Sequence, residues 1–185
     1  MKLIEKLREG TRDQHAQLDQ ISEMKMLTSD SVEEVDYKNY LLAFYNIYTT
    51  IESDIYDYSS KYVEGINSNE RLSQLKNDLR YFDVYNYSTE VNSQPGLNDK
   101  EYLGALYVME GSRLGGNLIG KHLKNHLDLE KANLEFLFSR PAVKWSRIIL
   151  LLNEQPIENH VEIVNGAQKV FQYFYDELYD FYNRI

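Results

Sequence analysis

The stretch Glu110-Gly111-Ser112-Arg113-Leu114-Gly115-Gly116-Asn117-Leu118-Ile119-Gly120 decides how this chain folds. It lies inside a long amphipathic helical pattern that extends from about Asp99 to about Leu127. Four of the nine glycines of the chain fall in it, and each glycine inside a helix costs about 1 kcal/mol relative to alanine. We therefore expect the helix to gain something from the missing side chains, namely a bend, close packing against another element, or close approach to a ligand.

Two of these glycines share a face of the predicted helix. Gly111 and Gly115 are four residues apart, which places them on the same side. A flat face without side chains accommodates either a neighbouring helix or a flat ligand, and the glycines alone favour neither interpretation. The other motifs of the chain have to decide between them.

Apolar residues recur at helical spacing along most of the chain, and we find no convincing strand pattern. We expect helices over residues 3–20, about 32–62, about 69–81 and about 99–127, another helix that begins at Ser139-Arg140-Pro141, and a last helix that begins at Pro156. Residues 21–30, 82–97 and 128–138 are predicted as connections. The sequence thus predicts one all-α domain over residues 1–185, an irregular bundle of six or seven helices.

Composition excludes several function classes. The net charge of −9 argues against nucleic acid as the main partner, because phosphate binding requires a positive field. The chain has no cysteine, which excludes disulfides, iron–sulfur clusters and thiol catalysis. It shows no signal-peptide pattern and no run of about 18 apolar residues. We therefore expect a cytoplasmic protein that does not associate with a membrane.

Three of the four histidines are interpreted as structural or exposed. His122 and His126 are four residues apart and able to share a helix face as metal ligands. No third ligand stands at a helpful spacing, and histidine near a helix C-terminus is favoured by the helix dipole. We interpret this pair as a surface or helix-end feature, and the isolated His160 as structural or exposed.

His15 is the fourth histidine, and it follows Leu7 and Thr11 on the apolar face of the first helix. A histidine in this position is either a packed core residue or a ligand, and neutral imidazole is the commonest metal ligand. A single histidine is able to hold heme iron on one side, and a glycine patch leaves the other side open to a small gas. His15 and the glycines together therefore suggest a heme pocket.

Heme carries two propionates, which need cationic partners at the pocket edge. Arg8 lies two turns before His15, roughly 10 Å along the helix axis. Lys144 and Arg147, three residues apart on another helix, are candidates for a second contact.

Two motifs resemble those of a known family. The segment Leu7-Arg8-Glu9-Gly10-Thr11-Arg12-Asp13-Gln14-His15-Ala16-Gln17-Leu18 resembles the opening helix of heme oxygenases, whose proximal histidine stands in the pattern L-[RK]-x-x-T-x-x-x-H-x-x-L. The segment from Tyr102 to Ile119 resembles the distal helix of the bacterial biliverdin-producing branch, which often accompanies bacteriophytochromes. The segment Ala167-Gln168-Lys169-Val170-Phe171 is similar to the last helix of the family.

The resemblance implies a set of site residues. His15 becomes the proximal ligand of the heme iron, and the distal face is lined by Gly111, Ser112, Gly115 and Gly116. The other heme-binding residues implied are Arg8, Thr11, Lys144 and Arg147, with Arg8 on one propionate and Lys144 or Arg147 on the other. Gly120, one turn further on, is expected to ease packing or bending instead.

The resemblance also implies a reaction, the oxidative opening of heme to biliverdin with release of iron and carbon monoxide. Heme is then both substrate and cofactor. The reaction consumes O2 and electrons, so the implied partners are a ferredoxin or flavoprotein reductase, with a bacteriophytochrome as a candidate acceptor of biliverdin.

One position separates the branches of the family. The animal-type branch has an aspartate after the first distal glycine, and this chain has Ser112 there, as the bacterial branch commonly does. The proton relay then falls to Ser112 or Arg113 acting through water. Two alternatives to the enzyme stay open: a non-catalytic heme-binding or sensing protein of the same fold, and a helical interaction module whose glycines serve only packing.

Overall fold

The computed structural model describes residues 1–185 except 68, 86–93, 130–132, 139–140 and 142, and within them it contains helices, turns and connections but no strand. The expected all-α class is confirmed. The elements are α1 (Leu3–Gly10), α2 (Arg12–Leu18), α3 (Ser22–Met26), α4 (Glu34–Ser59), α5 (Glu70–Tyr81), α6 (Glu101–His126), α7 (Glu135–Phe138), α8 (Trp145–Asn153), the 3-10 turn η2 (Ile157–Asn159) and α9 (His160–Tyr182).

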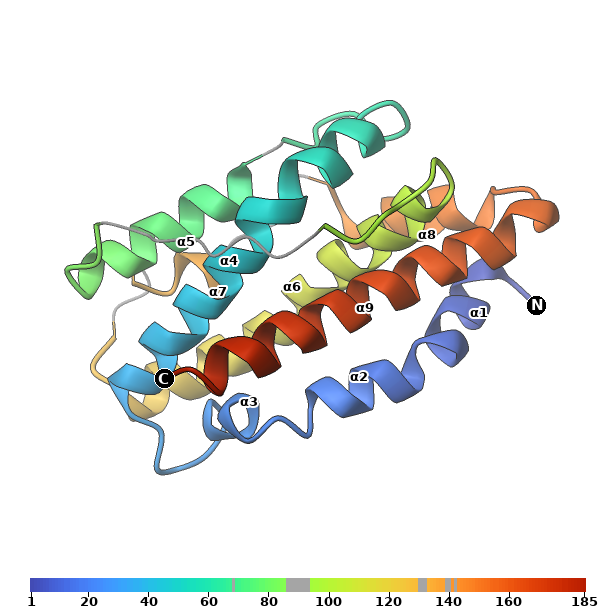
Figure 1. Ribbon diagram of the computed structural model, residues 1–185. Helices are drawn as coiled ribbons and strands as arrows, with labels where there is room; N and C mark the ends of the chain where they lie inside the picture. The colour runs from blue at the N-terminus through green and yellow to red at the C-terminus, as the bar shows by residue number, and fades with distance from the viewer. Residues whose placement is uncertain (68, 86–93, 130–132, 139–140, 142) are drawn as a thin grey trace.

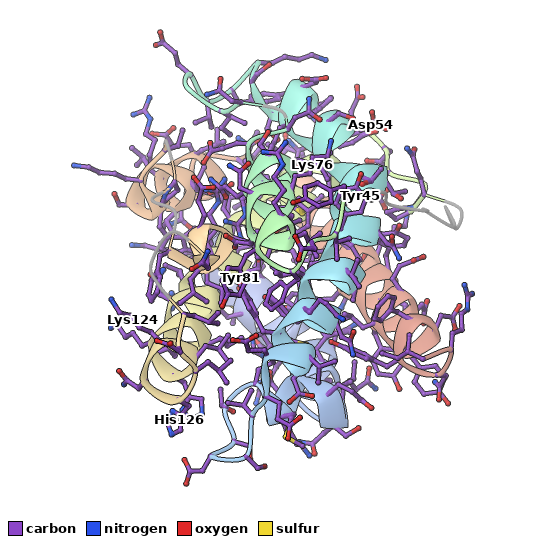
Figure 2. All side chains as sticks on the ribbon, turned by 90° about the vertical axis from the view of Figure 1, so that its left-hand side faces the viewer. Tyr45, Asp54, Lys76, Tyr81, Lys124 and His126 are labelled. Atoms are coloured by element: carbon purple, nitrogen blue, oxygen red, sulfur yellow. The ribbon has the colours of Figure 1, made fainter. Side chains whose placement is uncertain are left out.

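The long helices set the arrangement. Figure 1 shows α6 and α9 side by side, with α1 and α2 along one side of α9 and α4 and α5 on the other side of the molecule. Lys76 of α5 reaches over the ring of Tyr45 of α4, with its Nζ atom 5.9 Å from the ring centre (Figure 2). Across the described part of the chain, no helix combines the length and the apolar character that crossing a bilayer requires.

Several predicted boundaries are wrong. The expected helix over residues 3–20 breaks at Thr11, whose hydroxyl donates a hydrogen bond of 2.7 Å to the carbonyl of Leu7, a contact that often bends helices. The predicted connections 21–30 and 128–138 contain the short helices α3 and α7.

The start of α8 also differs from the prediction. Ser139 and Arg140 lie outside the described residues, but Pro141 precedes the helix instead of beginning it. Lys144 has an extended backbone and stands at the N-cap, so α8 begins at Trp145. In the predicted connection 82–97, residues 86–93 lie outside the described residues.

Two glycines allow α6 and α9 to cross with their backbones in contact. A Cβ atom on Gly104 of α6 would meet the backbone of Ile163 and Ala167 of α9. A Cβ atom on Gly166 of α9 would meet the backbone of Glu101 at the start of α6. Any side chain at either position therefore has to push the two helices apart. The sequence analysis did not identify this crossing.

A buried carboxylate joins α4, α5 and α7. Asp78 accepts hydrogen bonds from the hydroxyl of Tyr37, at 3.0 Å, and from the backbone N–H groups of Glu135 and Phe136, both at 2.8 Å. The last two bonds satisfy the first N–H groups of α7. Burial raises the pKa of Asp78 to about 6, although the three hydrogen bonds act in the opposite direction.

A second buried carboxylate, that of Glu52, holds the start of α5. Glu52 of α4 accepts hydrogen bonds from the backbone N–H groups of Arg71 and Leu72, at 2.8 and 2.9 Å. Burial raises the pKa of Glu52 above its usual value, while these bonds oppose the shift. The contact fixes the first turn of α5 against α4, and thereby the position of the Arg71 side chain.

Candidate functional site

A cavity of about 340 Å³ opens between α2 and α6. Elements from nearly the whole chain contribute to its lining, from Arg8 of α1 to Phe174 of α9. Aromatic side chains form much of the wall, among them Phe44, Tyr107, Phe136, Trp145, Phe171 and Phe174. An apolar cavity with a few polar groups is the usual form of a small-molecule site.

The structure brings the four residues expected on the distal face to this cavity, namely Gly111, Ser112, Gly115 and Gly116. A Cβ atom on Gly115 would meet no heavy atom within 4 Å, and one on Gly111 only the ring of Trp145, at 3.7 Å. These two glycines therefore leave the backbone of α6 bare on the side of the cavity.

The other two glycines of the quoted stretch pack against α7. A Cβ atom on Gly116 would lie 3.4 Å from Leu137 Cδ2, and one on Gly120 would lie 3.1 Å from both Leu137 Cβ and Phe138 Cζ. The packing interpretation of Gly120 is confirmed. The glycines of the stretch thus differ in what they face: Gly111 and Gly115 line the cavity, whereas Gly120 accommodates a neighbouring helix.

Ser112 is already engaged within the protein. Its hydroxyl donates to the carbonyl of Met109, at 2.7 Å, and its Oγ lies 3.3 Å from the hydroxyl of the buried Tyr48. Because a hydroxyl has a single proton, Tyr48 is the donor in the second contact. Ser112 is therefore arranged to accept further hydrogen bonds and not to donate them.

His15 lines the cavity from α2, but it is not part of the buried stripe on which the sequence analysis placed it. Leu7 and Thr11 are buried, whereas 63% of the His15 side chain is exposed. The break at Thr11 is the reason, since it turns α2 away from the direction of α1 and leaves α2 with no buried residue. The His15 ring lies 5.8 Å from the ring of Phe171 on α9.

A carboxylate orients the imidazole of His15. Its Nδ1 atom lies 3.0 Å from Oδ2 of Asp19, one turn further along the chain. With the Nδ1 proton donated to this carboxylate, Nε2 keeps its lone pair. A histidine that binds a metal is typically held in this way. Asp19 was not among the predicted site residues, although an acidic residue four positions after a candidate histidine was a usable signal.

Of the expected cationic contacts, only Arg8 lines the cavity. Lys144 and Arg147 are exposed and border a separate depression beside Leu150. The phase of α8 is the reason, because Trp145 and not its neighbours faces the cavity. The structure therefore does not bring Lys144 or Arg147, the residues expected to bind a propionate, to the cavity that His15 lines.

Thr11 is also absent from the lining, because its hydroxyl is turned to Leu7 in the helix break. Its neighbour Tyr107 does line the cavity. Burial raises the pKa of Tyr107, while hydrogen bonding to Thr11 and the charge of Arg8 lower it. The charge of Arg8 therefore acts on the hydroxyl of Tyr107 of α6.

Arg71 is a cavity residue that the sequence analysis did not find. Its side chain is 2% exposed, and its Nη1 atom donates to Gln74, at 2.8 Å, and to the carbonyl of Phe136, at 2.6 Å. Its guanidinium carbon lies 3.8 Å from the centre of the Phe136 ring, a cation–π contact. The local pattern around Arg71 shows only an ordinary polar residue of α5, so no sequence signal was available.

Arg113 points away from the cavity, into a buried network behind α6. Its Nε lies 3.2 Å from Glu110 Oε2 and its Nη1 lies 3.2 Å from Glu70 Oε1, while Tyr56 donates to Glu110 at 2.7 Å. Burial lowers the pKa of Arg113, but Tyr56 and the two carboxylates outweigh it and raise the pKa overall. Its candidate role beside Ser112 in a proton relay is not supported by this geometry.

The lining as a whole suits a mostly apolar ligand. Aromatic side chains enclose it, an imidazole with a free Nε2 lies on the α2 side, and bare backbone lies on the α6 side. Arg8 adds positive charge where the cavity meets α1.

Comparisons with known proteins agree with this geometry. The sequence matches the family model described as heme oxygenase over residues 1–179. No curated protein matches the sequence.

Solved structures give the fold. The NO- and CO-bound heme oxygenase from Neisseria meningitidis is similar with a TM-score of 0.78 and 20% identity, covering 99% of this chain and 93% of that one. Heme oxygenase from Leptospira interrogans has a TM-score of 0.76 and 18% identity, over 97% and 100% of the two chains. Heme oxygenase-1 from the cyanobacterium Synechocystis sp. PCC6803, solved in complex with heme, has a TM-score of 0.73 and 19% identity, over 100% and 94%.

Proposed function

Because this chain belongs to the heme oxygenase family, we propose that it opens heme oxidatively to biliverdin, with release of iron and carbon monoxide. The observation that carries the proposal is the cavity between α2 and α6, which has an oriented imidazole on one face and side-chain-free backbone on the other. Heme is the substrate, and it would supply both the iron that activates O2 and the macrocycle that is oxidised.

His15 holds the substrate from the α2 side in this proposal. Its Nε2 atom ligates the iron, and the hydrogen bond of 3.0 Å from Nδ1 to Asp19 fixes the tautomer and the plane of the ring.

The α6 side of the cavity presents no large side chain at its glycines and supplies hydrogen bonds. Gly111 and Gly115 leave room for a small gas against the backbone. Ser112 accepts a hydrogen bond from Tyr48 and keeps acceptor capacity for a water molecule, so Tyr48 and Ser112 would order water over the glycines. The proton needed for the oxidation would arrive through such water, since Ser112 has its own proton engaged at Met109.

The edges of the cavity orient the macrocycle. Arg8 would bind one propionate, and the ring of Tyr107 would pack beside it. Arg71, at the wall that Phe136 also forms, would hold that wall rigid through its bonds to Gln74 and to the Phe136 carbonyl. A ferredoxin or flavoprotein reductase as electron donor and a bacteriophytochrome as candidate acceptor rest on the sequence resemblance alone.

Hemin titration tests the proposal against its main alternative, a heme-binding or sensing protein of the same fold. A heme–histidine absorption band should appear on adding hemin to the purified protein, and a reductant with O2 should then convert it to a biliverdin spectrum with release of carbon monoxide. A band that persists unchanged under these conditions would favour the carrier. No band at all would exclude both heme-binding functions.

His15→Ala identifies the iron ligand in the same titration. The variant should lose the heme–histidine band, because its cavity retains no imidazole. His160→Ala is the matched control, since His160 is buried near the start of α9 and is not part of the cavity lining. An unchanged spectrum in His15→Ala would refute the assignment.

A further inference from the structure

A second candidate site lies at the C-terminal end of α6, outside the cavity. His122 and His126 of α6 meet Asp30 of the α3–α4 connection, and the three potential ligand atoms lie within 4.8 Å of one another. The sequence analysis found the histidine pair but no third ligand, because Asp30 is remote in the chain. None of the three residues lines the cavity, although Ile119, one turn before His122, does.

Hydrogen bonds to backbone carbonyls engage one ring nitrogen of each histidine. His122 Nε2 lies 2.9 Å from the carbonyl oxygen of Ser29, and His126 Nδ1 lies 2.9 Å from the carbonyl oxygen of His122. Carbonyl oxygens only accept, so both of these nitrogens carry protons. In the neutral imidazoles, the lone pairs are then on Nδ1 of His122 and Nε2 of His126, and such carbonyl contacts are typical supports of metal-binding histidines.

The contact between His126 and Asp30 brings a ring nitrogen next to a carboxylate oxygen. His126 Nε2 lies 3.2 Å from Asp30 Oδ1. An imidazole lone pair and a carboxylate oxygen repel at this distance unless a proton or a metal ion lies between them. Ligand atoms of a tetrahedral zinc site are about 3.3 Å apart, given metal–ligand bonds of about 2.0–2.2 Å. The spacing of this pair suits a shared metal ion, and binding requires the stacked rings of His122 and His126, whose centres lie 3.9 Å apart, to turn so that both lone pairs point at it.

The surroundings also favour a cation. His126 is the last residue of α6, where the helix dipole is negative. The side chain of Asp30 is 96% exposed and that of His126 is 33% exposed, so an ion can reach both from solution. Figure 2 shows the labelled His126 at this outer end of α6.

We propose that His122, His126 and Asp30 bind one divalent transition-metal ion, for which Zn²⁺ is the best match. Two imidazoles and a carboxylate suit borderline ions of this class, whereas Mg²⁺ and Ca²⁺ prefer oxygen ligands alone. The fourth position is open to water. Bound metal joins the α3–α4 connection to the end of α6 and stabilises the folded chain.

Calorimetric titration of the full chain with Zn²⁺ tests the site. One ion should bind per chain, and His126→Ala and Asp30→Asn should each weaken binding by about tenfold or more. Lys124→Ala is the matched control, because this exposed residue lies on the same turn of α6 and should leave binding unchanged. Mg²⁺ should not compete. Co²⁺ should give the visible absorption of a tetrahedral ion, and this absorption should disappear in His122→Ala.

His15→Ala separates this site from the cavity. Zinc binding in that variant should equal that of the unmodified chain, even though its heme spectrum changes. Zinc binding that is lost in His15→Ala, that survives in His126→Ala and Asp30→Asn, or that appears only at millimolar concentration would overturn the proposal. None of these outcomes bears on the heme reaction, because the three ligands lie outside its cavity.

Discussion

Replacing Gly115 by alanine should stabilise the protein, whereas replacing Gly120 by alanine should not. Both residues lie in α6, where an added methyl group improves helix propensity by about 1 kcal/mol. They differ in what the methyl group would meet. A Cβ atom on Gly115 has no heavy atom within 4 Å, whereas one on Gly120 lies 3.1 Å from Leu137 and from Phe138.

The magnitudes follow from these contacts. Gly115→Ala should gain the full propensity term and raise the free energy of unfolding by about 1 kcal/mol. Gly120→Ala gains the same term but overpacks α7, which typically costs about 1–3 kcal/mol. It should therefore be neutral to less stable, by up to about 2 kcal/mol.

Gly115→Ala should raise stability and at the same time weaken ligand binding. The added methyl group projects into the cavity that Gly115 lines, so hemin affinity should fall by roughly fivefold, the equivalent of about 1 kcal/mol. Gly120→Ala should bind hemin with less change, because its methyl group faces α7.

Urea unfolding and hemin titration of the same preparations measure both effects. The denaturation midpoint should rise for Gly115→Ala without a change in the slope of the transition. The reasoning is refuted if Gly115→Ala is less stable than the unmodified chain, if its hemin affinity is unchanged, or if Gly120→Ala is stabilised to the same degree.

Three further changes test other contacts. Asp19→Ala removes the partner of His15 Nδ1 and should weaken heme binding by about 10–100-fold, measured as the rate of heme loss, with exposed Asp13→Ala as the control; equal rates would exclude the orienting role. Asp78 has a pKa raised to about 6, so the folded state binds its proton more tightly than the unfolded state, and its contribution to stability falls as pH rises from about 4 to 6, by at most about 3 kcal/mol. Urea unfolding across this range should show a flatter pH dependence in Asp78→Asn, and parallel curves would contradict the shift. Gly166→Ala forces a side chain into the backbone of Glu101 and should lower the thermal midpoint more than Gly120→Ala does; the reverse order would mean that the crossing of α6 and α9 relaxes easily.

The long helices were predictable because each carries its own apolar periodicity. The short helices α3 and α7 were not, since helices of this length are unstable alone and form only where other elements satisfy them. Asp78 provides this for α7 by accepting hydrogen bonds from its first N–H groups. The break at Thr11 was not predictable either, because the apolar spacing of the sequence continues through it.

The site was predictable where its residues belong to local motifs. His15, Arg8, Gly111, Gly115 and Gly116 were identified from spacing and resemblance, and the structure brings them to one cavity. Arg71 was missed because only the packing of α5 against α4 and α7 turns it inward. Lys144 and Arg147 do not line the cavity because the phase of α8 depends on where it begins, which the prediction set too early.

The two walls of the cavity are anchored very differently. α6 is held against α9 at Gly104 and Gly166, backbone to backbone, whereas α2 has no buried side chain. Amide hydrogens of α2 should therefore exchange with solvent much faster than those of α6 around Gly104. Iron ligated by His15 would tie this loose wall to the rest of the molecule, and loss of the iron would release it. Binding of heme would in this way fix α2 over the cavity. The metal-free product would then leave because no bond to His15 holds α2 in place.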